Sequence, residues 1–244
     1  MDPKLLKEMF NSDQAPVVSL SLPDIPLQAQ AMAGKMSISG VQPKLSLRLD
    51  KHKRELVVAP TEGEFILKPQ IQQFPYTPEN ENCCMDIAGA LGIDVPPHCL
   101  LPLKDKSLAY VVKRFDRIGH EKIHQEDFCQ ILEKKDKYNG SLEQIGKKLK
   151  EISVVPGLDV QLFFERVVFS FLIGNGDGHF KNYSISYLKE GIRLAPAYDI
   201  VCSKLVLPNE EDSALTIRGK KNHLTRDDFD AFAEELGIIV RKQS

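Results

Sequence analysis

Alternation of polar and apolar residues marks the first half of the chain. It is clearest over residues 44–49, and short apolar runs follow at 64–68 and 108–113. A period of two residues is typical of half-buried strands. After a short amphipathic start, residues 11–30 contain Pro16, Pro23 and Pro26, which predict a linker or an edge-like segment. Residues 1–116 are therefore predicted to form a strand-rich lobe.

One stretch of the first half has a helical period instead. Residues 78–93 open with Pro78 and acidic residues, which favour a helix N-terminus, and Gly92 suits the end of the helix. Apolar side chains lie three and four residues apart along it, at Cys84, Ile87, Ala88 and Leu91.

Helical periods prevail in the second half, residues 117–244. The pattern predicts three helices, a hairpin and a last helix, at 124–132, 141–151, 159–173, 183–194 and 225–236. The charged run 134–140 is predicted to be a solvated loop, with a partner surface as the alternative. The two halves together predict an α+β fold, with an N-lobe of residues 1–116 and a helical C-lobe of residues 117–244.

Composition narrows the class of protein. The chain has 244 residues, of which 42% are hydrophobic, so a folded globular protein is expected. Its net charge of −2 argues against direct nucleic-acid binding and against a polybasic membrane anchor. Five cysteines without a C-x-x-C pair predict reduced thiols rather than a zinc site. With no apolar run suited to a signal peptide or a membrane span, a cytoplasmic location is expected.

The candidate chemistry follows the third of these helices. The segment Asn175-Gly-Asp-Gly-His-Phe-Lys-Asn182 presents four functional side chains within six residues, and Asp199 comes seventeen residues later. An aspartate, an asparagine five residues on and a later aspartate have the spacing of protein-kinase catalytic residues. In that interpretation Asp177 accepts the proton of a substrate hydroxyl, while Asn182 and Asp199 bind Mg²⁺. Taken singly, the segment is more typical of an ordinary tight turn, with His179 a loop histidine.

Basic residues from both halves could offset phosphate charge: Lys44, Lys68, His179 and Lys181. Lys68 ends a predicted strand and could pair with Glu81 of the predicted helix, as the corresponding residues do in protein kinases. An edge-strand lysine in solvent is the alternative, and Glu81 could equally serve only its own helix N-terminus.

Two further segments suit nucleotide binding. A glycine- and serine-rich turn over 34–43 precedes Lys44 and could lay backbone N–H groups over phosphates, although such turns are common. At the end of the strand predicted over 108–113, Lys113-Arg-Phe115 suits a hinge that contacts adenine. Core packing is the alternative for Phe115.

These motifs, in this order, resemble the HipA family of bacterial serine/threonine kinases, the toxins of type II toxin–antitoxin systems. The segments that carry the resemblance are Ser37-Ile-Ser-Gly-Val-Gln-Pro-Lys44, Phe65-Ile-Leu-Lys68, Asn80-Glu81, Lys113-Arg-Phe-Asp116, His124-Gln-Glu-Asp127, Asn175–Asn182 and Leu194-Ala-Pro-Ala-Tyr-Asp199.

The resemblance implies a two-lobed protein-kinase-like fold that uses ATP and Mg²⁺. Asp177 is then the catalytic base, Asn182 and Asp199 the metal ligands, and Lys68 and Glu81 an ion pair. The implied nucleotide contacts are Ser39, Gly40, Val41, Gln42, Pro43, Lys44, Lys68, Lys113, Arg114, Phe115, His179, Lys181, Asn182 and Asp199. Ser37 and Ser39 are the implied autophosphorylation sites. The implied substrate is an aminoacyl-tRNA synthetase, and a helix-turn-helix HipB-like antitoxin is the implied partner.

The chain departs from this family at both ends. About 36 residues precede the serine loop, where HipA has a small N-terminal subdomain. Together with the Ser-x-Ser pair, this resembles HipT, the shortened kinase of a three-part system in which a small HipS-like protein takes the place of the subdomain. The chain also ends soon after Gly237, where the family usually continues with further helices.

Three functions are compatible with the resemblance. The first is an active toxin kinase acting on a tRNA synthetase. The second is a secreted effector kinase of the same fold with a host protein as target. The third is a pseudokinase that binds nucleotide without transferring phosphate to protein.

Overall fold

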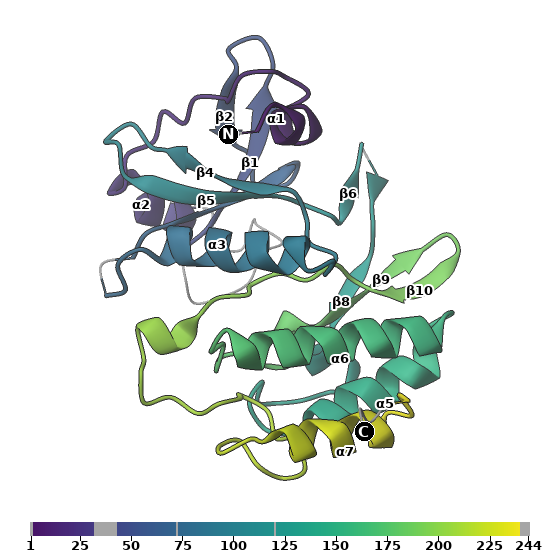
Figure 1. Ribbon diagram of the computed structural model, residues 1–244. Helices are drawn as coiled ribbons and strands as arrows, with labels where there is room; N and C mark the ends of the chain where they lie inside the picture. Colours follow the sequence, from purple (N-terminus) through teal and green to yellow (C-terminus); the bar gives the residue numbers. More distant parts are fainter. Residues whose placement is uncertain (1, 32–42, 72, 120, 240–244) are drawn as a thin grey trace. The chain divides into compact units, whose positions relative to one another are not determined.

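The strand patterns of the first half form one antiparallel sheet (Figure 1). The computed structural model describes residues 2–31, 43–71, 73–119 and 121–239. Within them the strand order is β2-β1-β3-β5-β4. The predicted strands are confirmed, and two more complete the sheet: β1 Leu45–Asp50, β2 Glu55–Val58, β3 Phe65–Pro69, β4 His98–Pro102 and β5 Leu108–Lys113.

Of the two alternatives predicted for the first thirty residues, the linker was wrong, whereas an edge-like segment is present at Val17, which pairs with Glu55 of β2. This stretch contains helices α1 (Pro3–Phe10) and α2 (Asp24–Ala31), and their apolar side chains enter the core of the sheet. The ring of Phe10 lies 5.2 Å from that of Phe65. Proline misled the prediction because Pro26 lies in the first turn of α2, where an N–H has no intrahelical partner to lose.

Residues between these helices extend the sheet beyond β2. Val17 forms a parallel bridge with Glu55. Its N–H donates to the carbonyl of Arg54 at 2.9 Å, and its carbonyl accepts from the N–H of Leu56 at 2.9 Å. The N-terminal stretch therefore pairs with the outer strand as well as packing on the sheet.

Helix α3 (Thr77–Ala90) confirms the helix predicted in the first half, but with a different buried face. Ile87 and Leu91 are exposed, and the buried side chains are Glu81, Cys84, Met85 and Ala88. Successive strand residues point to opposite faces, so Leu67 joins the core with α1 and α2 while Lys68 points the other way. There it meets Glu81, which places α3 on the second face of the sheet.

The second half combines helices and a three-stranded sheet, β10-β9-β8, around one core, and β6 and β7 form a separate two-stranded sheet. The helices are α4 (Phe128–Ile131), α5 (Leu142–Ile152), α6 (Pro156–Leu172) and α7 (Arg226–Glu235), with short turns η1 (Phe180–Asn182) and η2 (Ser203–Leu205). The strands are β6 (Arg117–Ile118), β7 (Glu121–Lys122), β8 (Gln125–Asp127), β9 (Ser184–Leu188) and β10 (Gly191–Leu194). Phe163, Phe180 and Phe232 are fully buried in the shared core.

The structure corrects the prediction of a helix over 124–132. Residues 125–127 form β8, which pairs with β9, and the helix begins only at Phe128. Asp127 ends the strand and caps the helix, because its carboxylate accepts the N–H of Gln130 at 2.9 Å. The other helices and the hairpin of the second half are confirmed.

The chain folds as two compact units. One contains residues 1–86 and 96–117, and the other contains residues 87–95 and 118–244. The five cysteines all lie in the described ranges, and none of them is in a disulfide bond. In the described ranges, no helix combines the length and the apolar character needed to cross a bilayer.

Candidate functional site

The loop after α6 carries Asp177 into solvent between two glycines. The carboxylate Oδ1 of Asp177 accepts the hydroxyl of Tyr138 at 2.8 Å. The N–H of Asp177 points back to the side-chain oxygen of Asn175 at 3.3 Å. Asn175 is buried and Asp177 is exposed, so the loop holds one side chain inward and presents the other.

A second segment, residues 203–211, is hydrogen-bonded to this loop. The N–H of Gly176 donates to Ser203 Oγ at 2.8 Å and to Glu210 Oε1 at 3.2 Å, and the Ser203 hydroxyl donates to the same carboxylate. A Cβ on Gly176 would lie 2.4 Å from the carbonyl oxygen of Glu211. The glycine is therefore required by close approach of the segment that follows Asp199.

Asn182 closes the turn that begins at His179. The side-chain oxygen of Asn182 accepts the N–H of His179 at 3.0 Å, and the N–H of Asn182 returns to the carbonyl of His179 at 2.9 Å. Phe180, between them, is fully buried in the core. These contacts fix Asn182 relative to His179, two residues after Asp177.

Tyr198 brings Asp199 to the same place. Its hydroxyl donates to the carbonyl of Lys181 at 2.9 Å and is also hydrogen-bonded to Ser184. The segments that carry Asp199 and Asn182 therefore lie side by side. Asp199 has a φ of 55°, a left-handed conformation that costs a non-glycine residue about 1 kcal/mol. Such strained residues cluster at functional sites.

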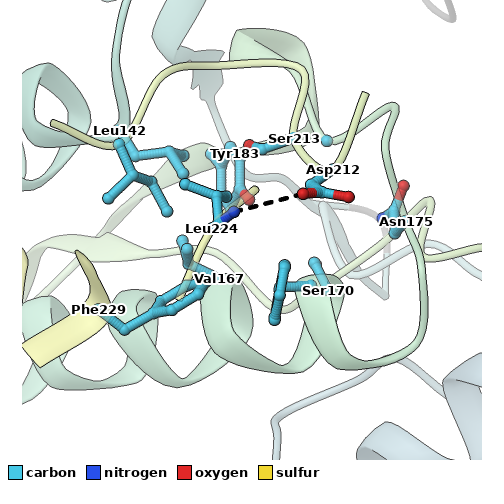
Figure 2. Close-up of a pocket in the computed structure, with 12 residues that line it drawn as sticks. Leu142, Val167, Ser170, Asn175, Tyr183, Asp212, Ser213, Leu224 and Phe229 are labelled. Carbon is cyan, nitrogen blue, oxygen red and sulfur yellow. Dashed lines mark hydrogen bonds between the residues drawn. The ribbon is translucent and has the colours of Figure 1, made fainter. Parts of the chain in front are cut away.

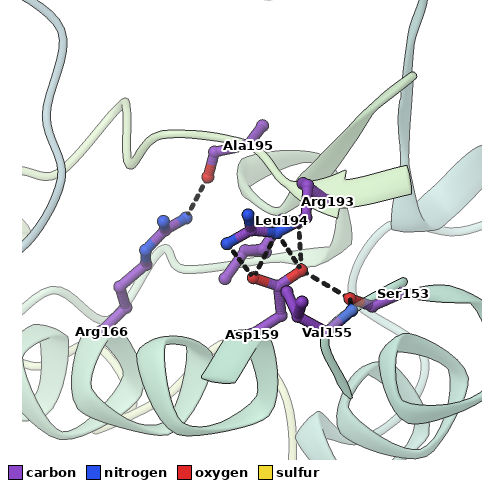
Figure 3. A network of polar contacts seen from close by, with 7 residues as sticks. All are labelled: Ser153, Val155, Asp159, Arg166, Arg193, Leu194 and Ala195. Carbon is purple, nitrogen blue, oxygen red and sulfur yellow. Dashed lines mark hydrogen bonds and ion pairs between the residues drawn. The ribbon is translucent and has the colours of Figure 1, made fainter. Parts of the chain in front are cut away.

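Asp159 and Arg166 of α6 hold the strand that leads into Asp199 (Figure 3). The fully buried carboxylate of Asp159 accepts the guanidinium of Arg193 at 3.0 Å and the N–H of Leu194 at 2.9 Å. Arg166 donates to the carbonyl of Ala195 at 2.6 Å. Burial lowers the pKa of Arg166 to about 10, so it stays charged at neutral pH.

His179 is buried beneath the loop, and its Nε2 lies 2.7 Å from the ammonium of Lys137. Burial lowers the pKa of the imidazole below its ordinary value and the charge of Lys137 lowers it further, against the opposing effect of Asp177. A neutral histidine whose Nε2 accepts from lysine does not offset phosphate charge. The surroundings of His179 therefore argue against its predicted contact with phosphate. Lys181, in contrast, is exposed to solvent.

Four residues at this site were missed from the sequence: Lys137, Tyr138, Ser203 and Glu210. The first two belong to the charged run 134–140, which was predicted to be a solvated loop. Lys137 and Tyr138 instead contact the candidate catalytic loop. Charge alone gave no sign of this, since the contacts join residues about forty positions apart.

The other predicted residues lie in the first unit or outside the described ranges. Lys68 and Glu81 form a buried ion pair of 2.6 Å. Since β3 is an inner strand and Lys68 is only 6% exposed, the alternative of a solvated edge lysine is wrong. Ser37, Ser39, Gly40, Val41 and Gln42 lie outside the described residues, while Pro43 and Lys44 lie immediately before β1.

The hinge predicted at 113–115 begins at Lys113, the last residue of β5. The N–H groups of Lys113 and Arg114 donate to the carbonyls of Pro97 and Glu64, each at 2.8 Å. The ammonium of Lys113 donates to the carbonyl of Glu8 at 2.8 Å, and Arg114 makes a two-bond ion pair with Asp116. The backbone N–H groups and the side chains of both residues are therefore already hydrogen-bonded within the first unit.

A small cavity lies between α6, α7 and the candidate loop (Figure 2). Its walls include Val167 and Ser170 of α6, Phe229 of α7, and Asn175. The free volume for the centre of a water molecule is about 10 Å³, enough for about one water. This cavity is far too small for a nucleotide.

Comparison with known proteins identifies the family. Residues 36–244 match the HipA-like C-terminal domain. The chain belongs to this family. Its HipA-like relatives include Y4mE of Sinorhizobium fredii, provisionally named a kinase, which is 34% identical over 95% of this chain and 59% of its own length. A provisionally named kinase of Haemophilus influenzae is 33% identical over 85% of this chain and 70% of its own length.

The serine/threonine-protein kinase toxin HipA of Shewanella oneidensis is 26% identical over 84% of this chain and 52% of its own length. The solved structure of that organism's HipA with HipB and operator DNA matches with a TM-score of 0.65, over 84% of this chain and 53% of that one, at 25% identity. The proinflammatory kinase CtkA of Helicobacter pylori matches with a TM-score of 0.58 over 83% of this chain and 78% of that one, at 18% identity. These likenesses confirm the predicted α+β protein-kinase-like fold.

The chain spans 59% of the length of Y4mE and about half of the length of Shewanella HipA. The matches establish HipA-like membership and do not separate the shortened HipT type from full-length members.

Proposed function

We propose that the chain is a serine/threonine protein kinase that transfers the γ-phosphoryl group of ATP to a protein hydroxyl. The observation that supports this best is the placement of Asp177, Asn182 and Asp199 on adjacent segments of one unit. Asp177 is exposed between two glycines, as a base that must reach a substrate hydroxyl requires. HipA-like membership and the kinase names of relatives add to this support.

Phosphoryl transfer depends on positioning and charge neutralisation. In the proposed reaction Asp177 orients the substrate hydroxyl and accepts its proton. Lys181, which is exposed next to Asn182, offsets phosphate charge. His179 instead supports the loop from below, through its bond with Lys137 and its turn with Asn182.

Asn182 and Asp199 supply the donors that suit Mg²⁺. An amide oxygen and a carboxylate are hard oxygen ligands, and Mg²⁺ in phosphoryl-transfer sites takes one or two such ligands from the protein. Both residues are partly exposed. The bound ion would neutralise charge that develops on the phosphates.

We further propose the biological setting of a type II toxin. A relative carries the name of a kinase toxin, and its solved complex contains HipB and operator DNA. The proposed partner is accordingly a HipB-like helix-turn-helix antitoxin, and the proposed substrate is an aminoacyl-tRNA synthetase. Ser37 and Ser39 are the proposed autophosphorylation sites.

The first prediction tests the proposed base. The purified chain is incubated with radiolabelled ATP and Mg²⁺ together with a tRNA synthetase preparation, and label in protein is measured. Asp177→Ala should lower transfer by about 10²–10⁴-fold, because general-base catalysis contributes that much. Asp227→Ala, which removes an exposed carboxylate on α7, is the matched control and should leave transfer unchanged.

Equal labelling by wild type and Asp177→Ala would contradict the assignment of the base. Labelling of the chain alone at Ser37 or Ser39, with none in any synthetase, would support the kinase and reject the proposed substrate class. Omission of Mg²⁺ should abolish labelling in each case.

A further inference from the structure

The carboxylate of Asp177 has an unusual setting for a proposed base. Gly176 and Gly178 flank it, so neighbouring side chains do not restrict it. Its Oδ1 accepts the hydroxyl of Tyr138. Within the described residues, Oδ2 accepts no hydrogen bond. One oxygen is therefore held and the other remains open to a substrate.

Tyr138 is itself held firmly. Its ring stands edge-on to that of His179, with centroids 5.2 Å apart. The ammonium of Lys137 lies 4.7 Å from the centroid of the Tyr138 ring and bonds to His179. The carbonyl of Lys137 accepts the N–H of Phe180 at 3.2 Å, which ties the backbone to the candidate loop. These contacts hold the Tyr138 ring next to His179, with its hydroxyl directed at Asp177.

The protonation state of Tyr138 suits this donor role. Burial and the hydrogen bond to Asp177 raise the pKa of the phenol above its ordinary value. The hydroxyl therefore stays protonated at neutral pH and donates to the carboxylate.

We propose that Tyr138 is a positioning residue that fixes Oδ1 of Asp177 and directs Oδ2 to the substrate hydroxyl. This rests on the proposed kinase function. As the substrate oxygen bonds to the γ-phosphorus of ATP, the bond from that phosphorus to the bridging oxygen of ADP breaks, and the substrate proton moves to Oδ2. Tyr138 keeps its own proton throughout.

The test compares two tyrosines of equal exposure in the same unit. Tyr138 and Tyr187 are each 39% exposed, and each hydroxyl donates to a carboxylate, that of Tyr187 to Glu126 on β8. Tyr138→Phe should lower kcat for phosphate transfer about tenfold or more, since misplaced catalytic groups cost up to about a hundredfold, with KM for ATP unchanged. Tyr187→Phe should leave both values as in wild type, and both variants should keep the wild-type Tm.

A second variant separates donation from packing. Replacing Tyr138 with 3-fluorotyrosine keeps the hydroxyl donor and should keep the wild-type kcat. Wild-type kcat in Tyr138→Phe would overturn the proposal, and so would an equal loss of kcat in Tyr187→Phe. Loss of kcat in the 3-fluorotyrosine protein, matched by a fall in Tm, would also overturn it. Absence of transfer in wild type would instead reject the kinase function on which it rests.

Discussion

The ion pair of Lys68 and Glu81 shows what a single residue can and cannot reveal in sequence. The pattern around Lys68 allowed a solvated lysine or a paired one. The structure places it on an inner strand, 2.6 Å from Glu81 and 5.7 Å from the ring centroid of Tyr110. Burial of a lysine requires such a partner, because a desolvated charge alone is very costly. The pair is observed, whereas its contact with phosphate stays a prediction.

Breaking this pair should destabilise the first unit strongly. Lys68→Met leaves Glu81 buried without its cation, which should cost about 3–5 kcal/mol in the free energy of unfolding. Urea unfolding of the purified variant measures this. The double variant Lys68→Met/Glu81→Leu should recover most of the loss, since an apolar pair of similar size avoids the buried charge. A double variant as unstable as the single one would argue against the ion pair as the cause.

At the scale of elements, local sequence signals predicted most helices and strands correctly, whereas contacts between distant segments were missed. Caps and periodicity located α5, α6 and α7, since Ser141 and Thr225 begin two of these helices and Gly237 follows the last. Strand β8 was missed because its partner β9 lies about sixty residues away. In addition, the three residues of β8 are too few to show the alternation of polar and apolar residues that predicts a strand. For the same reason the sequence predicted the loop with Asp177 but not the contact with Tyr138.

The loop after α6 should not tolerate a side chain at Gly176. In Gly176→Ala the new Cβ would meet the backbone oxygen of Glu211 and the carboxylate of Glu210, at 2.4 and 2.6 Å. The loop must then shift, which should cost about 1–3 kcal/mol, as overpacking does. Thermal unfolding measures this as a lower Tm.

The matched control for this prediction is Gly157→Ala in α6. A Cβ there meets nothing within 4 Å. Alanine favours the helix over glycine, so the control should be neutral or more stable by about 0.5–1 kcal/mol. Equal Tm values for the two variants would show that the close approach at Gly176 can relax.

On the scale of the whole molecule, each of the two units has its own buried core. The family resemblance anticipated the fold class because its motifs spread along most of the chain. It did not anticipate that the first thirty residues help to build a core. That depended on side chains such as Ile25, whose burial comes from tertiary packing rather than from any local period. Local signals therefore specified elements, and packing decided which of them form a core.

The acid stability of the second unit should depend on Asp228 at the start of α7. Its carboxylate accepts the side chain of Lys220 at 2.8 Å and the N–H and hydroxyl of Thr225, and these bonds lower its pKa to about 2. A lowered pKa means that the folded state favours the charged form. The stabilisation is therefore complete above pH 3.8, the ordinary value, and is lost as pH falls through about 2.

Thermal unfolding across pH should reveal this in Asp228→Asn. The variant should have a lower Tm than wild type near neutral pH, and the difference should shrink between pH 4 and pH 2, where the wild-type carboxyl becomes protonated. Asp227→Asn, at the neighbouring exposed position, should follow wild type. A Tm difference that stays constant down to pH 2 would contradict the assignment.

The bridge between Val17 and the outer strand β2 has a consequence for self-association. An open strand edge offers unpaired N–H and C=O groups to any other chain, and this promotes aggregation. Here Val17 takes one donor and one acceptor of that edge for itself. A shortened chain without its first twenty residues would expose those groups together with the apolar side chains that α1 now covers. We therefore expect removal of the N-terminal stretch to promote edge-to-edge association of the sheet.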